Sequence, residues 1–225
     1  MTIAARTNRL LMALRRDGVT DEAVLSALER VPRDLFVPDL FRDQAWEDTA
    51  LPIALGQSIS QPLIVGLMTQ ALELEPRHTV LEIGTGSGYQ AAVLSRLCRR
   101  VYTIERLKPL LVEAEKRFQR LRLHNITTRL GDGTRGWPEV APFERILVTA
   151  AGGPEPPKDL TDQLAVGGVM VIPLGVDDRG QRVVRFRRTA EGLVREELWP
   201  VRFVPLLSDP PAETPPGSEA SARLP

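Results

Sequence analysis

The sequence has almost none of the side chains on which metal and disulfide chemistry depend. Cys98 is the one cysteine among 225 residues, and His78 and His124 are the two histidines. A single thiol excludes an internal disulfide and a thiolate metal cage, and two imidazoles are too few for a typical zinc site. We therefore expect neither a bound metal nor a disulfide in this protein.

A net charge and a long apolar run are absent as well. Lys plus Arg and Asp plus Glu each number 29, so no overall field draws the chain to nucleic acid or to an anionic membrane. No apolar stretch approaches the length that spans a bilayer, and residues 1–17 lack the apolar run and cleavage site of a signal peptide. We expect a cytoplasmic protein without nucleic-acid or membrane partners, and we take a monomer as the working hypothesis.

The residues that are abundant are those of a globular protein. Hydrophobic residues make up 43% and charged residues 26%, which suits one domain with a sizeable core. We expect that domain to cover residues 1–208, with helices and an active-site loop over 1–60 and a sheet over 79–208. Residues 209–225 are rich in Pro, Ser and Ala, so they cannot offset the entropy of ordering and should form a disordered tail.

Short apolar runs alternate with helical stretches through the middle of the chain. The helical stretches are 63–74, 89–97 and 108–121, and the runs interpreted as strands are 79–83, 101–104, 126–130, 146–149 and 169–173. This alternation predicts parallel strands joined by crossover helices, hence an α/β sheet covered on both faces. After Gln181 two apolar runs follow without a helix between them, which predicts an antiparallel hairpin at the sheet edge, turning near Glu191–Gly192.

A glycine-rich loop separates the first predicted strand from its helix. It reads Glu82-Ile83-Gly84-Thr85-Gly86-Ser87-Gly88, and glycines at such a place let a ligand approach the main chain closely. Roughly twenty residues after the first glycine, Glu105 ends the second strand, where a carboxylate can accept hydrogen bonds from both ribose hydroxyls. Strand, loop, helix and acid together predict a nucleoside-type ligand at the carboxyl ends of the strands.

The spacing of the glycines discriminates between cofactors. Dinucleotide enzymes favour G-x-G-x-x-G, whereas this loop is G-x-G-x-G and follows an acid inside the strand. S-adenosylmethionine has no pyrophosphate to place at a helix N-terminus, and the Glu82 carboxylate could favour its amino group and sulfonium, directly or through water. S-adenosyl-L-methionine is therefore the expected cofactor, and NAD is the alternative that the spacing disfavours.

A second acid-glycine pair, Asp132-Gly133, follows the third predicted strand. Its carboxylate could accept the exocyclic amine of an adenine, while Gly133 leaves room for the ring. Gly-Asp-Gly is also good turn chemistry in any protein. Because the pair lies at the end of a strand and downstream of Glu105, we favour cofactor binding over a simple turn.

These motifs resemble those of the protein-L-isoaspartate O-methyltransferases in their bacterial and archaeal form. The matching segments are VPR at 31–33, GQSISQP at 56–62, VLEIGTGSGY at 80–89, GDG at 131–133, TAA at 149–151 and VRFVPL at 201–206. The Ile-Ser-Gln-Pro segment is the most particular, because general methyltransferases have no such loop before the first strand. The places that depart from the family pattern, and that could alter the rim of the pocket, are Trp46, Leu63, Glu144 and residues 152–157.

The resemblance implies a Rossmann-like methyltransferase fold and a protein-repair activity. The methyl group of S-adenosylmethionine would pass to the free α-carboxylate of L-isoaspartyl residues in damaged proteins and peptides. The ester would then cyclise to a succinimide, whose hydrolysis returns some normal aspartate. A carboxylate is already ionised at neutral pH, so the transfer needs positioning and exclusion of water rather than a general base. Methylation of a small molecule or of RNA is the alternative, and the Ile-Ser-Gln-Pro segment weighs against it.

The resemblance also implies which residues form the site. Ser60 is expected at the catalytic position, holding a carboxylate oxygen in line with the methyl group, although a Ser there is also suited to capping the helix that starts near Pro62. The substrate is expected to pair through its main chain with the segment that contains Val201, Phe203, Val204, Pro205 and Leu206. The expected cofactor contacts are Ser58, Ile59, Glu82, Gly84, Thr85, Gly86, Ser87, Gly88, Glu105, Asp132 and Gly133.

Overall fold

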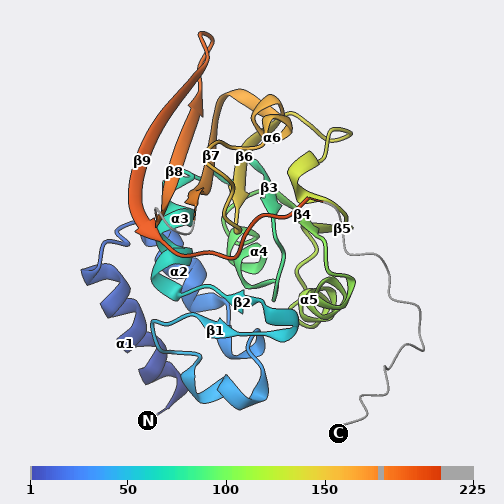
Figure 1. Ribbon diagram of the computed structural model, residues 1–225. Coiled ribbons are helices and arrows are strands. Elements are labelled where there is room, and N and C mark those ends of the chain that lie inside the picture. The colour runs from blue at the N-terminus through green and yellow to red at the C-terminus, as the bar shows by residue number, and fades with distance from the viewer. Residues whose placement is uncertain (1, 177–179, 209–225) are drawn as a thin grey trace, which may run out of the picture.

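The protein is organised around one continuous sheet. The computed structural model describes residues 2–176 and 180–208, and within them the sheet has seven strands in the order β5-β4-β3-β6-β7-β8-β9 (Figure 1). Their bounds are β3 (Thr79–Ile83), β4 (Arg100–Glu105), β5 (Ile126–Leu130), β6 (Phe143–Val148), β7 (Leu164–Val176), β8 (Gly180–Arg188) and β9 (Leu193–Val201). The α/β class expected from the alternating pattern is confirmed, and so is the Rossmann-like fold that the resemblance implies.

The direction of the strands divides the sheet into two parts. Strands β3 to β7 pair in parallel, with β3 between β4 and β6. Strands β7, β8 and β9 pair antiparallel, so the predicted hairpin at the edge is confirmed, and its turn closes with a 2.7 Å bond from the Thr189 N–H to the Gly192 carbonyl. The chain leaves β3 for β4 on one side and later fills the other side with β6, which places a topological switch point at the carboxyl end of β3.

The helices cover the two faces of the sheet. Their bounds are α1 (Ile3–Arg16), α2 (Glu22–Arg30), α3 (Pro62–Ala71), α4 (Tyr89–Leu94), α5 (Lys108–Arg120) and α6 (Lys158–Asp162), with short 3-10 turns at Arg33–Leu35, Asp39–Gln44, Ala54–Gly56 and Gly133–Arg135. Local chemistry sets some of the boundaries: the Asp21 carboxylate caps α2 by accepting from the Ala23 and Val24 N–H groups. No helix within the described ranges is long and apolar enough to cross a membrane.

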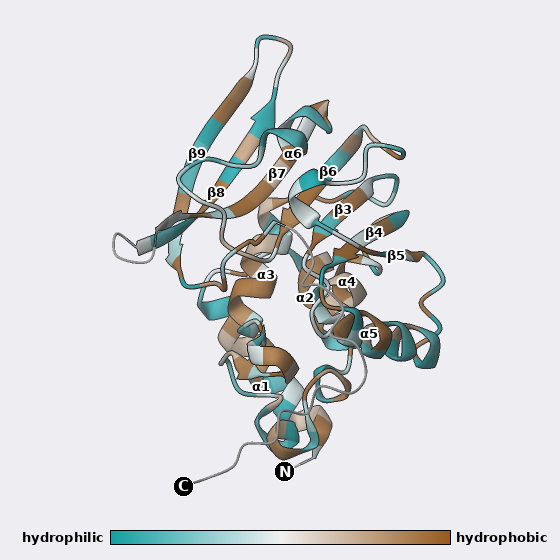
Figure 2. Ribbon diagram, turned by 45° about the vertical axis from the view of Figure 1, so that its right-hand side comes forward, coloured by the Kyte–Doolittle hydropathy of each residue, from teal (hydrophilic) through white to brown (hydrophobic). Residues whose placement is uncertain are grey.

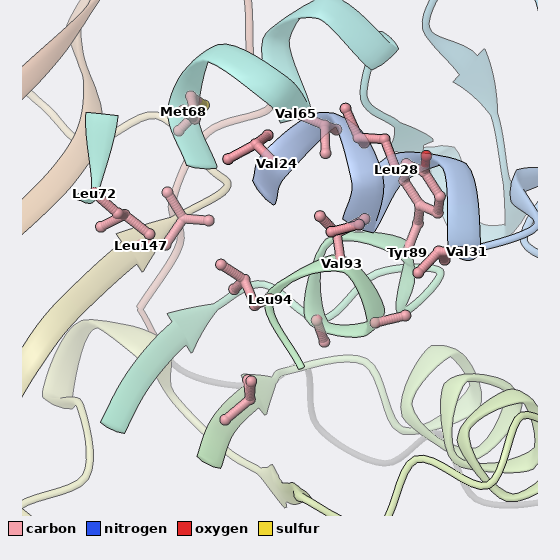
Figure 3. Close-up of a cluster of buried hydrophobic side chains, with 14 of the residues drawn as sticks. Val24, Leu28, Val31, Val65, Met68, Leu72, Tyr89, Val93, Leu94 and Leu147 are labelled. Atoms are coloured by element: carbon pink, nitrogen blue, oxygen red, sulfur yellow. The ribbon is translucent and has the colours of Figure 1, made fainter. Parts of the chain in front are cut away.

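Two hydrophobic clusters hold the helices to the sheet. The larger one contains buried residues of α1 to α5 together with Val80, Val101 and Leu147, and Figure 3 shows its centre, where Val24, Val65 and Leu94 lie between α2, α3 and α4. The second cluster lies on the other face of the sheet and includes Ile146, Val148 and Leu160. Successive residues of β6 thus enter opposite clusters, as the period of two in a strand requires. Figure 2 shows the hydrophobic residues concentrated in the central strands and in α3 and α4.

The structure differs from the predicted elements in the segment before α3. Residues 56–62 read as a loop, but β1 (Leu51–Pro52) and β2 (Ser58–Ile59) form a small antiparallel hairpin there. The pairing is stabilised because Leu51 and Ile59 stand opposite each other and are both buried, at 3% and 2% exposure.

Two other elements differ from their predicted bounds. Helix α4 ends three residues earlier than the predicted residue 97. The strand predicted over 169–173 extends over 164–176, because β8 pairs along the whole second half of that longer strand. The predicted tail, 209–225, lies outside the described residues.

Candidate active site

A cavity opens at the carboxyl end of β3, at the topological switch point. Its volume is about 250 Å³, and its walls come from the β1–β2 hairpin, the loop after β3, the end of β4 and the segment that follows β9. The lining includes twelve of the residues predicted from the sequence: Ser58, Ile59, Ser60, Gly84, Thr85, Gly86, Ser87, Glu105, Gly133, Val204, Pro205 and Leu206. Segments far apart in the chain therefore meet around one space.

Three of the predicted cofactor contacts, Glu82, Gly88 and Asp132, lie outside the wall of this cavity. Gly88 has a packing reason to be glycine, because its φ is +88° and a Cβ atom there would lie 2.7 Å from Phe118 Cε1. The Asp132 Oδ1 atom accepts hydrogen bonds from the Thr134 N–H at 2.8 Å and the Thr134 hydroxyl at 2.7 Å. That is the turn chemistry considered as the alternative for this residue, and it leaves Gly133 to face the cavity.

The glycine loop is fastened to β6 by a threonine. The Thr149 hydroxyl lies 2.9 Å from the Ile83 carbonyl oxygen and 2.7 Å from that of Gly84, and it donates its proton to this pair. Gly84 has a φ of +95°, and a Cβ atom there would lie 2.5 Å from Thr149 Oγ1, so glycine is required for the close approach. Thr149 lines the cavity but was not predicted as a site residue. Its only signal in the sequence is its place in the TAA match at 149–151.

Glu105 joins the end of β4 to the glycine loop. One carboxylate oxygen accepts from the Gly86 N–H at 2.8 Å and the other from the Leu107 N–H at 2.9 Å. The residue is only 5% exposed, yet it lines the cavity. Because each carboxylate oxygen has two lone pairs, these backbone bonds leave acceptor capacity for a pair of ribose hydroxyls. Glu105 can therefore hold the loop and bind a ligand at the same time.

Glu82 is in a different position from that expected. It is 0% exposed and lies behind the cavity wall, where its Oε2 atom accepts from the Thr103 hydroxyl at 2.5 Å. The Thr103 and Thr85 hydroxyl oxygens are 2.6 Å apart, and Thr85 does line the cavity. The pKa of the Glu82 carboxyl is raised to about 8 from an ordinary value of 4.5, mainly by burial and in part by the nearby Glu105. Glu82 thus reaches the cavity only through two threonines, and its proton is retained at neutral pH.

Asp48 rather than Ser60 caps helix α3. One Asp48 carboxylate oxygen accepts from the Leu63 N–H at 2.8 Å, and the other accepts from the Gln61 side-chain amide at 2.8 Å. The N-cap residue itself is Gln61, and it makes no side-chain cap bond. Within the described part of the chain the Ser60 hydroxyl has no hydrogen-bond partner. The capping alternative considered for Ser60 is therefore wrong, and Ser60 lines the cavity.

Arg33 fixes the segment that carries Ser60. Its guanidinium donates to the carbonyl oxygens of Ala45 at 2.9 Å, Thr49 at 3.0 Å and Ser60 at 3.0 Å. The residue is 3% exposed, and burial lowers the pKa of its guanidinium. Its Cζ atom lies 5.7 Å from the centre of the Tyr89 ring, and Tyr89 lines the cavity. Arg33 was not predicted as a site residue, although the VPR match at 31–33 contains it.

The segment after β9 returns across the sheet to the cavity. The Ala151 N–H donates to the Val204 carbonyl at 2.8 Å, and the Leu206 N–H donates to the Ala151 carbonyl at 2.7 Å. Phe203 exchanges two bonds with the Gln181 side chain, of 2.6 Å and 3.2 Å. Val201 and Phe203 lie outside the cavity wall, whereas Val204, Pro205 and Leu206 form part of it. Only the second half of the predicted substrate segment therefore reaches the cavity.

The departures from the family pattern do not reach this space. Among the described residues that line the cavity there is none of Trp46, Leu63, Glu144 or residues 152–157. The Glu144 carboxylate accepts from the Thr79 N–H at 2.9 Å, and the Trp46 ring lies 5.4 Å from the Arg6 Cζ atom. Their contacts are structural, so they do not shape the wall of the pocket. Within residues 2–176 and 180–208, no group of three His, Cys, Asp or Glu side chains could hold a metal ion.

Comparison with known proteins agrees with the site. The family model for protein-L-isoaspartate(D-aspartate) O-methyltransferase matches residues 5–210. Proteins named protein-L-isoaspartate O-methyltransferase from Rhodospirillum centenum and Rhodospirillum rubrum are 72% and 63% identical over 221 and 220 residues, covering 98% and 97% of this chain and 100% of each relative. A putative enzyme of that name from Plasmodium falciparum, solved in complex with S-adenosyl-L-homocysteine, has a TM-score of 0.79 at 25% identity, covering 89% of this chain and 98% of its own.

Replacing Glu105 with alanine should weaken binding of S-adenosylmethionine by about tenfold to a hundredfold, since one charged acceptor for two hydroxyls is lost. Calorimetric titration with S-adenosylmethionine measures the affinity, and the exposed Glu139→Ala variant, which removes a carboxylate far from the cavity wall, serves as the control. An unchanged dissociation constant in Glu105→Ala would contradict the proposed contact.

Glu82→Gln should flatten the pH dependence of stability. The folded protein retains the Glu82 proton up to about pH 8, whereas an unfolded glutamate releases it near 4.5, so the free energy of unfolding falls as the pH rises between these values. This one group contributes a slope of up to about 1.4 kcal/mol per pH unit. Urea unfolding of the wild-type protein and of Glu82→Gln at pH 5, 6, 7 and 8 gives the slope of the free energy of unfolding against pH for each protein. Parallel curves of this free energy would show that Glu82 is ionised in the folded state.

Proposed function

The chain belongs to the protein-L-isoaspartate(D-aspartate) O-methyltransferase family, and from that membership we propose the roles of its cavity residues. It is an S-adenosylmethionine-dependent protein-repair methyltransferase whose substrates are isoaspartyl-containing proteins. The observation that carries the proposed roles is the cavity itself, which brings the glycine loop, Glu105, Ser60 and the segment after β9 around one space. The acceptor is proposed to be the free α-carboxylate of an L-isoaspartyl residue.

The glycine loop and Glu105 form the proposed cofactor half of the cavity. Glu105 would accept the ribose hydroxyls, and the main chain from Gly84 to Ser87 would lie against the methionine part of the cofactor. Gly133 would lie on the adenine side, packed so closely that a Cβ atom there would lie 2.3 Å from Cγ2 of Ile83, another residue of the cavity wall. When bound, S-adenosylmethionine supplies the activated methyl group. Ser58 and Ile59 would close this half from the hairpin, while Gly88, Asp132 and Glu82 would act on the loop from behind.

Ser60 and the segment after β9 form the proposed substrate half. The acceptor carboxylate is ionised at neutral pH, so the protein needs to orient one of its oxygens rather than remove a proton. The Ser60 hydroxyl is supported for that task because it has no partner among the described residues, while Arg33 holds its carbonyl oxygen and Asp48 holds Gln61 and Leu63, which follow it. Val204, Pro205 and Leu206 would contact the peptide main chain, while Val201 ends β9 and Phe203 anchors the segment to Gln181 of β8.

The cellular location, the oligomeric state and the absence of other partners are further proposals. We propose that the protein acts in the cytoplasm and as a monomer. We also propose that it has no nucleic-acid or membrane partners, which the balance of 29 basic and 29 acidic residues supports. Methylation of a small molecule or of RNA is the alternative acceptor class. The full-length relatives named for isoaspartate methylation weigh against it.

Two peptides that differ only in carrying isoaspartate or aspartate test the acceptor. We expect labelled methyl from S-adenosylmethionine to be released as volatile methanol, after base treatment, from the isoaspartyl peptide alone. Base-labile label is expected because a carboxyl methyl ester hydrolyses readily. Label from neither peptide, with cofactor binding intact, would overturn the assignment of the acceptor, and RNA and metabolite mixtures assayed in parallel would then test the alternative.

Ser60→Ala should lower kcat by at least about tenfold while leaving cofactor affinity within about twofold, because one positioning hydrogen bond to a charged oxygen is lost. Its melting temperature should be unchanged, since Asp48 caps α3, whereas Asp48→Ala should lower the melting temperature. Single-turnover rates, calorimetry and thermal unfolding separate these effects. A normal rate in Ser60→Ala, with Ser26→Ala on α2 as the matched control, would contradict the catalytic role.

A further inference from the structure

Leu55 occupies a backbone conformation that a large side chain rarely adopts. It lies between β1 and β2 with φ 58° and ψ 34°, in the left-handed region. Within the described ranges the other non-glycine residues with positive φ are Glu73 and Arg122. For a bulky residue this conformation costs free energy, and glycine or asparagine would relieve it. Unfavourable backbone conformations are concentrated at functional sites, so the Leu55 side chain is a candidate for a functional contact.

The fold of the hairpin does not account for the leucine side chain. The turn is closed by main-chain bonds, from the Ile53 N–H to the Gln57 carbonyl at 2.9 Å and from the Gln57 N–H to the Ala54 carbonyl at 3.2 Å. The Leu55 side chain is not buried by the rest of the chain, because the residue is 54% exposed. The hairpin therefore presents an apolar group to the surroundings and leaves more than half of its surface uncovered.

The position of the turn places Leu55 at the mouth of the cavity. The residues that follow it, Gly56, Gln57 and Ser58, all line the cavity. A Cβ atom on Gly56 would meet no heavy atom within 4 Å, so the space beside the turn is open. Leu207, from the segment after β9, also lines the cavity and is 47% exposed. Two exposed leucines from distant segments thus flank the opening through which a peptide must extend.

We propose that Leu55 contacts the side chain of a residue next to the isoaspartate, so that the protein favours damaged sites with apolar neighbours. This inference rests on the proposed site, where the isoaspartyl carboxylate enters the cavity and the peptide continues outward in both directions. Main-chain contacts with Val204 to Leu206 treat all sequences alike, whereas a leucine at the rim discriminates by side chain. Burial of a half-exposed leucine against an apolar neighbour corresponds to about a three- to tenfold preference.

The test compares two isoaspartyl peptides of equal charge, with leucine or serine on both sides of the isoaspartate. Equal charge is needed because Arg106 also lines the cavity and would respond to charged neighbours. We expect the wild-type protein to show a kcat/KM about three- to tenfold higher for the leucine peptide. In Leu55→Gly that ratio should fall to about one through loss on the leucine peptide alone, with unchanged cofactor affinity.

Three controls make the outcome decisive. Leu55→Gly relieves the positive φ, so its melting temperature should not fall, and Arg122→Gly makes the same backbone change at an exposed residue outside the cavity wall and should keep the wild-type ratio. Leu55→Asn suits the same φ without an apolar side chain and should behave like Leu55→Gly.

Two outcomes would overturn the inference. One is a ratio of kcat/KM between the two peptides that Leu55→Gly leaves unchanged, and the other is an equal loss of kcat/KM on both peptides in Leu55→Gly that is absent in Leu55→Asn. No methylation of either peptide by the wild-type protein would instead overturn the proposed function, and the inference with it.

Discussion

Arg33 places a buried guanidinium among the carbonyl oxygens of Ala45, Thr49 and Ser60, three points on the segment that links the N-terminal helices to α3. A cation at 3% exposure is costly unless its donors are satisfied, so those carbonyls must stay where they are. The Tyr89 ring beside it belongs to α4, which follows the glycine loop. One side chain therefore ties the proposed substrate half of the cavity to the cofactor half, and the position of Ser60 depends on it.

Two carboxylates at the ends of neighbouring strands have different surroundings. Glu105 accepts two backbone N–H bonds and lines the cavity. Glu82 has one hydroxyl donor and no contact with solvent, so burial raises its pKa to about 8. A protonated Glu82 adds no negative charge behind the glycine loop. The two acids therefore act on the loop in different ways, Glu105 through bonds to its main chain and Glu82 through the Thr103 and Thr85 hydroxyls.

The antiparallel edge of the sheet has a role beyond covering β7. It carries the chain back so that residues 204–206 can pair with Ala151, directly after β6, and complete the cavity wall. The pattern of two apolar runs without a helix predicted the hairpin correctly, but it contained no information about where the following segment would lie. Only half of the predicted substrate segment reaches the cavity, because Phe203 is turned toward Gln181.

Local pattern determined the parallel strands, the crossover helices, the glycine loop and Glu105, since strand periodicity and glycine spacing are properties of neighbouring residues. The resemblance to the methyltransferase family, rather than local pattern, placed Ser60 at the site, and it left open whether Ser60 also capped a helix. Tertiary structure decided that question, because the capping carboxylate comes from Asp48, fifteen residues before Leu63. It also decided the burial of Glu82 and the roles of Arg33 and Thr149, whose partners lie on other segments. Contacts between segments distant in sequence leave no local signal, so the fold alone could assign them.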